Sequence, residues 1–93
     1  MTNDSDDWIV LPAIAGVPIG HTITVACNAG GGFEARTPAA SSTKINNVIA
    51  DGTQELLMTD TTVVVFRKIS DGDGWQAVEY PIAGGVSAAV TPN

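Results

Sequence analysis

The feature that most constrains this fold is a run of β-branched and aromatic residues over 61–69, Thr-Thr-Val-Val-Val-Phe-Arg-Lys-Ile. Side chains branched at Cβ are stiff about χ1 and pack well on a pleated surface, so the run predicts a strand. Alternation places Val64 and Phe66 on one face of that strand. It places Val63 and Val65 on the opposite face, so both faces are apolar and each needs a covering layer.

Two arrangements would cover the second face of this strand. A partner subunit can supply the layer, because apolar burial only roughly offsets the entropy of ordering in so small a domain. Alternatively, Arg67 and its neighbours line that face while a long loop covers Val63 and Val65. We favour the partner and expect a homo-oligomer, in which the Gly- and Ala-rich tail over 83–90 can lie along a neighbouring subunit as an added strand.

Short apolar or alternating segments recur along the rest of the chain between clusters of Gly, Pro, Asn and Asp. They predict strands over 8–11, 21–27, 33–36 and 75–80. The segment 54–58 fits one helical turn or a short strand, of which we prefer the strand, and 86–90 is either a final strand or an extended arm. The Gly-rich segment 28–32 is predicted to join 21–27 to 33–36 as a hairpin, and the turn 70–74 to join 61–69 to 75–80. The small polar stretch 37–43 is predicted to be a surface loop.

This pattern predicts an all-β protein, a small antiparallel β-sandwich that is jelly-roll-like or a partly open barrel, with extended N- and C-terminal arms. The chain has 93 residues, which suits one domain. We place that domain over 8–81, with an acidic, flexible arm over 1–7 and an extended tail over 82–93.

The charge balance argues against polyanionic partners. Ten acidic and four basic residues give a net charge of -6, the wrong sign for neutralising phosphates, so we expect no nucleic acid and no membrane partner. The N-terminal segment 1–7 carries Asp4, Asp6 and Asp7 and lacks the basic residues of a secretory signal. We therefore expect a protein that is made in the cytoplasm and not secreted.

The sequence offers few candidates for catalytic or metal-binding residues. His21 stands alone at the start of a strand, where a structural role is more common than catalysis. Cys27 shares a face with Ile23 and Val25 and is expected to be buried as a small hydrophobe. The segment 71–74, Asp-Gly-Asp-Gly, is too short for a calcium loop, because a strand follows it at once. We expect no enzyme activity, no metal and no cofactor.

Large apolar residues near the ends of the chain are the candidates for an interface. Trp75 follows a tight turn and is expected to pack in the core. Trp8 lies beside the acidic arm and is the strongest interface candidate, because tryptophan often anchors protein contacts. The complete set of candidate interface residues is Trp8, Ile9, Val63, Val65, Val86 and Val90.

The order of several short motifs resembles a known group of proteins. These motifs are Ile23-Thr24-Val25 leading to Asn28-Ala29-Gly30, then Lys44-Ile45-Asn46, then Val63-Val64-Val65-Phe66-Arg67-Lys68, then Gly74-Trp75. Over about residues 20 to 80 the chain looks like the small all-β structural proteins of tailed bacteriophages, among them capsid decoration (cement) proteins and related head or tail fibre modules.

The resemblance implies a virion protein that binds and does not catalyse. It implies a homotrimer on the outside of the capsid, where each copy contacts the major capsid protein and stabilises the shell. The alternative is a trimerisation, receptor-binding or glycan-binding module of a phage head or tail fibre. A small cupin-like enzyme or hydrolase would need converging His, Cys, Asp or Glu side chains, which one His and one Cys supply poorly.

Overall fold

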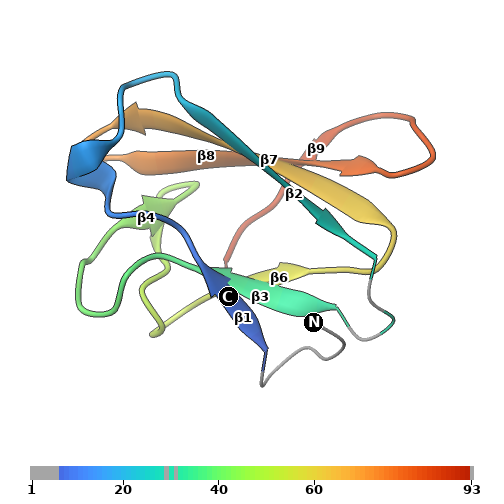
Figure 1. The fold of residues 1–93 in the computed structure, drawn as a ribbon, viewed down its shortest axis with the longest axis horizontal. Coiled ribbons are helices and arrows are strands. Elements are labelled where there is room, and N and C mark those ends of the chain that lie inside the picture. The colour runs from blue at the N-terminus through green and yellow to red at the C-terminus, as the bar shows by residue number, and fades with distance from the viewer. Residues whose placement is uncertain (1–6, 29, 31, 93) are drawn as a thin grey trace.

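Two β-sheets face each other in the computed structural model, which describes residues 7–28, 30 and 32–92 (Figure 1). The elements in chain order are β1 (Trp8–Val10), the 3₁₀ turn η1 (Ile14–Gly16), β2 (Thr22–Cys27), β3 (Phe33–Arg36), β4 (Lys44–Ile45), β5 (Val48–Ile49), β6 (Leu56–Met58), β7 (Thr62–Ser70), β8 (Gly74–Pro81) and β9 (Ala88–Ala89). The predicted all-β sandwich is confirmed, and the two sheets do not close into a barrel.

The large sheet has the order β2-β7-β8-β4-β5, and β9 adds to β8. Its centre is the predicted hairpin of β7 and β8, which pair from Thr62↔Pro81 to Ser70↔Gly74. The turn between them is held by Ser70, whose Oγ accepts a hydrogen bond from the Asp73 N–H at 2.8 Å. Two strands that the sequence pattern did not assign, β4 and β5, form a short second hairpin at the far edge.

The small sheet has the order β1-β3-β6, and it corrects the predicted hairpin of 21–27 with 33–36. β2 pairs with β7, while β3 crosses to the other sheet and pairs with β1 and β6. Gly32 makes this crossing possible, because it has φ +74° and a Cβ there would lie 2.3 Å from the Met58 carbonyl oxygen. The Gly-rich segment is therefore a link between sheets and not a hairpin loop.

Two strand pairs are parallel, although the sequence predicted an antiparallel sandwich. β1 runs parallel to β3, with Trp8 opposite Glu34, and β4 runs parallel to β8 at Ile45↔Trp75. Parallel neighbours require a connection that returns across the fold, and both pairs here join segments that are distant in the chain. The remaining pairs are antiparallel.

The core fills the space between the two inner sheet faces. Its largest fully buried side chains are those of Trp75, Phe66, Ile45, Leu56, Met58 and Val64. Trp75 and Cys27 are fully buried, as expected from the sequence. The Cys27 Sγ lies 3.8 Å from the Met58 carbonyl oxygen, so this thiol joins the end of β2 to the small sheet.

The segment 37–43 is a loop, as its composition predicted, and residues 39–42 are exposed, but its two end residues are not on the surface. Thr37 and Thr43 are both buried, and the Thr37 hydroxyl donates a hydrogen bond to the Thr43 carbonyl at 3.1 Å. The Thr43 N–H in turn donates to the Ser41 hydroxyl at 3.2 Å. Small polar residues can be buried here because the segment satisfies its own hydrogen bonds.

The C-terminal segment packs on its own chain. Ala88 and Ala89 pair with Glu79 and Val78 of β8, which selects the strand over the extended arm for this part of the tail. Pro92 beyond them is buried. The predicted N-terminal arm over 1–7 lies outside the described residues except for Asp7, whose carbonyl accepts a hydrogen bond from the Glu34 N–H at 3.0 Å.

Candidate binding surfaces

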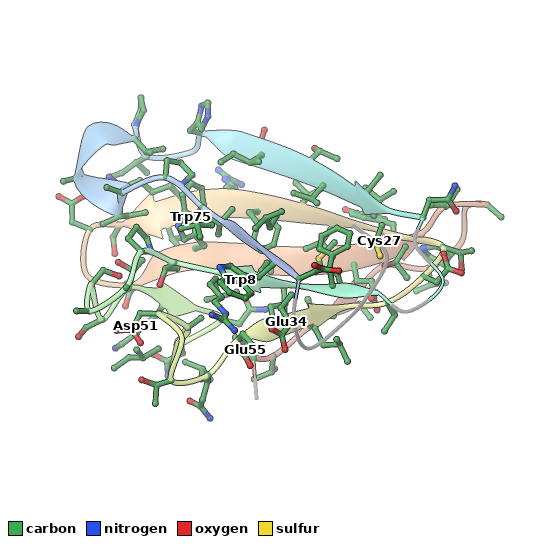
Figure 2. The ribbon with its side chains drawn as sticks, turned by 60° about the horizontal axis from the view of Figure 1, so that its bottom comes forward. Trp8, Cys27, Glu34, Asp51, Glu55 and Trp75 are labelled. Carbon is green, nitrogen blue, oxygen red and sulfur yellow. The ribbon has the colours of Figure 1, made fainter. Side chains whose placement is uncertain are left out.

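The outer face of the small sheet carries a group of aromatic and charged side chains that we call the Trp8 cluster: Trp8, Glu34, Arg36 and Glu55. Figure 2 labels Trp8, Glu34 and Glu55 of this group. In β3 the side chains of Phe33 and Ala35 enter the core, so alternation turns Glu34 and Arg36 outward. The parallel register places Trp8 beside Glu34. One sheet face therefore gathers these groups from β1, β3 and the segment before β6.

Arg36 is the centre of the Trp8 cluster. Its guanidinium carbon lies 4.1 Å from the centroid of the Trp8 ring, a cation–π contact. Its Nη2 lies 3.2 Å from Glu34 Oε1, and its Nε lies 3.1 Å from Glu55 Oε2. These contacts orient the Trp8 ring while leaving 43% of the residue exposed.

Glu34 is the most strongly shielded member of the Trp8 cluster. Burial raises the pKa of its carboxyl above the ordinary value of 4.5, and the charge of Glu55 raises it further, while the hydrogen bond from Arg36 opposes both. The cluster therefore holds two carboxyl groups around one guanidinium. Ionisation of Glu34 beside Glu55 is energetically unfavourable, because one positive charge is shared between two negative ones.

The outer face of the large sheet carries a second group, which we call the valine face: Val63, Val65, Val78 and Tyr80. The β7–β8 register places Val63 opposite Tyr80 and Val65 opposite Val78, so the four form one patch. Val63, Val65 and Val78 are half-buried and Tyr80 is exposed. They stay accessible, so the predicted covering loop does not bury Val63 and Val65 in the described chain.

The structure divides the predicted interface residues among different places. Trp8 lies on the small sheet, whereas Val63 and Val65 lie on the opposite outer face. Val86 lies between β8 and β9 and is 90% exposed. Ile9 and Val90 pack against the core, so within this chain they belong to the interior.

Among the described residues, the side chains that usually serve in catalysis or metal binding do not converge on one site. His21 is exposed at the start of β2, and Cys27 is buried at its other end. Within residues 7–28, 30 and 32–92, no group of three or more His, Cys, Asp or Glu side chains is placed to hold a metal ion. No helix in the same ranges is long and apolar enough to cross a membrane.

Sequence reasoning missed two buried charges. Lys68 lies on the inner side of β7, and its Nζ donates hydrogen bonds to the Ile14 carbonyl at 2.8 Å and to the Val17 carbonyl at 2.5 Å. It also pairs with Asp71 at 2.6 Å. The spacing of Lys68 could have revealed its burial, because Lys68 lies on the same face of β7 as Val64 and Phe66. Glu34 gave no comparable signal, because the parallel partner that shields it cannot be read from local sequence.

The chain matches no protein-family model, and it shows no significant similarity to a curated protein sequence or to a solved structure.

Proposed function

We propose that this chain is a non-enzymatic virion structural protein that binds the outside of a phage capsid and stabilises it as a decoration or cement protein. The observation that carries the proposal is that both outer faces of the sandwich present large apolar groups to solvent. Trp8, Val10 and Leu57 are exposed on the small sheet, and the valine face lies on the large sheet. Apolar patches rimmed by polar groups are typical of protein-binding surfaces.

Two opposite faces suit a protein that contacts both its own copies and a scaffold. The four residues of the valine face carry no charge, which suits contact between copies in a homotrimer. The Trp8 cluster combines an indole ring with a guanidinium, the two groups most common among residues that dominate binding energy. We assign it to the major capsid protein. This choice of scaffold rests on the order of short sequence motifs that resembles phage structural proteins.

The mechanism is linkage by mass action. A protein that binds the assembled shell and not the free shell subunits lowers the free energy of the assembled state. The net charge of -6 helps to keep the free protein soluble before it binds the shell. No bond is made or broken in this process, and the protein leaves its partner chemically unchanged.

The test is binding of the purified protein to undecorated shells from the native source, measured by cosedimentation and cryo-electron microscopy. We expect Trp8→Ala to weaken binding about tenfold or more, since truncation of a central aromatic removes much of a binding hot spot. Ile19→Ala is the matched control, because Ile19 is exposed and belongs to neither surface. Shells without bound protein, or equal binding by both variants, would contradict the proposal.

A fibre module that binds a receptor glycan is the second candidate, and the Trp8 cluster is the observation that favours it. An exposed indole flanked by carboxylates offers a stacking surface together with hydrogen-bond acceptors. A glycan array with a hit that Trp8→Ala abolishes and Ile19→Ala retains would select this function. An array on which neither the wild type nor the control binds would remove it.

A further inference from the structure

β2 is an edge strand whose outer backbone groups are open. It pairs with β7 along one side, from Thr22↔Arg67 to Cys27↔Thr62, and no other described strand pairs with it. The Lys68 N–H donates to the His21 carbonyl at 3.0 Å, which fixes the alternation of the ladder. His21 and every second residue after it point their backbone groups at β7. The N–H and C=O groups of Thr22, Thr24 and Ala26 therefore point away from β7, at the open edge of the sheet.

This edge lacks the features that usually prevent strands from pairing with other chains. Natural edges are kept short, or carry charges, prolines or bulges. The edges β1, β5, β6 and β9 have two or three residues each, whereas β2 has six, Thr-Ile-Thr-Val-Ala-Cys. None of those six residues is charged or a proline. Among the described edge strands, β2 is thus the longest, and it lacks the features that would hinder pairing with another chain.

The core is also incomplete along β2. Ile23 and Val25 point inward and pack against the core, yet both remain only half-buried. Cys27, on the same face, is fully buried because the small sheet covers it. The open margin of the sandwich therefore exposes both backbone hydrogen-bonding groups and core-facing apolar side chains.

We propose that β2 pairs antiparallel with β2 of a second copy of this chain, around a two-fold axis at Thr24. In this register Thr24 faces Thr24 of the second copy, and Thr22 faces Ala26 of the second copy. Each outward residue then donates one hydrogen bond and accepts one. Ile23 meets Val25 of the second copy on the core side, which covers the two half-buried side chains.

The sequence of β2 favours β2 of a second copy as the strand that pairs with its open edge. The register is self-complementary, as an isologous contact requires, and it matches two edges of equal length. The strand carries no charge, so the net charge of -6 on each copy is not concentrated at the contact. The large sheets of the two copies become one continuous sheet.

The inference does not depend on the proposed function. The edge of β2 is separate from the Trp8 cluster, and pairing leaves the valine face free. Two-fold pairing at β2 alone gives a dimer, whereas three-fold contact at the valine face alone gives a trimer, so the measured mass separates the two contacts. The experiment below uses the purified chain alone, and its outcome is independent of any shell.

The primary test is amide hydrogen exchange by NMR, with sedimentation at the same concentrations. We expect the amides of Thr22, Thr24 and Ala26 to exchange at least about tenfold more slowly as the protein is concentrated and dimers form. The amides of Ile23, Val25 and Cys27 bond to β7 in either state and serve as internal references. A protein that stays monomeric overturns the proposal. So does an oligomer in which the first three amides still exchange rapidly.

Variants at the two-fold axis give the second test. Thr24→Lys places two ammonium groups opposite each other and is expected to raise the dimer dissociation constant about tenfold or more. Gln76→Lys adds the same charge to an exposed site on the same sheet, away from the edge, and should leave the constant within about twofold.

Thr24→Pro removes the outward N–H, which is not bonded to β7, so the strand keeps its own ladder. We expect a folded protein, verified by circular dichroism, that has lost the two-fold contact, measured by sedimentation. A dimer that survives both substitutions at Thr24 contradicts the proposal.

Discussion

Lys68 is a charged side chain in the interior, and its three partners explain why the fold tolerates it. The residue is only 3% exposed, and burial of an unpaired ammonium would be very costly. Its Nζ instead donates to two carbonyls of the η1 region and to the carboxylate of Asp71. One side chain thereby fixes the chain before β2 against the central hairpin.

We predict that Lys68→Met destabilises the protein by about 2 kcal/mol, because the Ile14 and Val17 carbonyls lose a charged donor. Chemical denaturation measures the change. Arg67→Met is the matched control, since Arg67 is the next residue on the strand and its side chain is exposed. That control should change stability by less than about 0.5 kcal/mol. Equal losses in both variants would contradict the assigned role.

Glu34 gives a pH dependence whose sign follows from its raised pKa. Between the ordinary value of 4.5 and the raised value, the folded state holds a proton that the unfolded state has lost. The contribution of Glu34 to the free energy of unfolding therefore falls as pH rises through this window. Glu34→Gln removes that fall, so the stability of the variant relative to the wild type should increase with pH. Denaturation at several pH values measures it.

Asp51 provides a control of opposite sign. The hydrogen bond from the Ser42 N–H, at 3.0 Å, lowers the pKa of its carboxyl below the ordinary value of 3.8. This stabilisation is present above 3.8 and is lost as pH falls through the lowered value. Asp51→Asn should therefore lose stability relative to the wild type as pH rises through that range. The same slope in both variants would contradict the assignment for Glu34.

At the scale of elements, the β7–β8 hairpin depends on a glycine at its turn. Gly74 has φ +74°, and a Cβ there would lie 2.3 Å from the Lys44 carbonyl oxygen. The backbones of β8 and β4 approach closely at this point, next to the parallel pair Ile45↔Trp75. A side chain would both strain the backbone and push the two strands apart.

We predict that Gly74→Ala destabilises the protein by about 3 kcal/mol, because strain and a backbone clash act together. Gly72→Ala lies in the same turn, where no atom comes within 4 Å of an added Cβ, and should change stability by less than about 0.5 kcal/mol. Thermal and chemical denaturation of the two variants check this. Similar melting temperatures for both would contradict the role of the contact with Lys44.

The elements were predictable where the signal was local. The run of valines and the Asp-Gly turn specify β7, β8 and their hairpin, because branching at Cβ and turn chemistry act within a few residues. β4 and β5 were not assigned, because they have only two residues each; they form a local hairpin, and only the contact of β4 with β8 joins distant parts of the chain. The false hairpin of β2 with β3 arose because a Gly-rich link suits a turn and a crossing equally well.

At the scale of the whole molecule, Asn46 joins three segments that are far apart in the chain. Its Oδ1 accepts a hydrogen bond from the Ala77 N–H at 3.0 Å, and its Nδ2 donates to the Ala77 carbonyl at 2.9 Å. The same Nδ2 donates to the carbonyl of Val90. The side chain thus continues the β4–β8 pairing and holds the C-terminal segment against the fold.

We predict that Asn46→Asp releases the C-terminal segment, because a carboxylate keeps the acceptor and loses both donated hydrogen bonds. Amide exchange of Ala88 to Val90 should become at least about tenfold faster. Asn47→Asp, at the exposed neighbouring position, makes the same change in charge without these contacts and should leave the exchange unaltered. Unchanged protection in Asn46→Asp would contradict the role of this side chain.

The candidate surfaces were predictable from the sequence only in part, because they depend on which distant strands pair with each other. Alternation within one strand places Val63 and Val65 on a common face, and the structure keeps both partly accessible. The Trp8 cluster depends on β1 lying parallel to β3, which no local pattern encodes. For the same reason Ile9 and Val90 were read as surface residues although they pack against the core.

The pairing of β2 with β7 sets the order in which this protein can fold during its synthesis. β3 to β6 separate β2 from β7 along the chain, so β2 has no neighbour on either side until β7 has formed. The β7–β8 hairpin is local and closes quickly, after which β2 docks onto it in a slower, non-local step. Until that docking step, the six-residue strand β2 is unpaired on both sides, so the partly folded chain is most prone to aggregation through this strand.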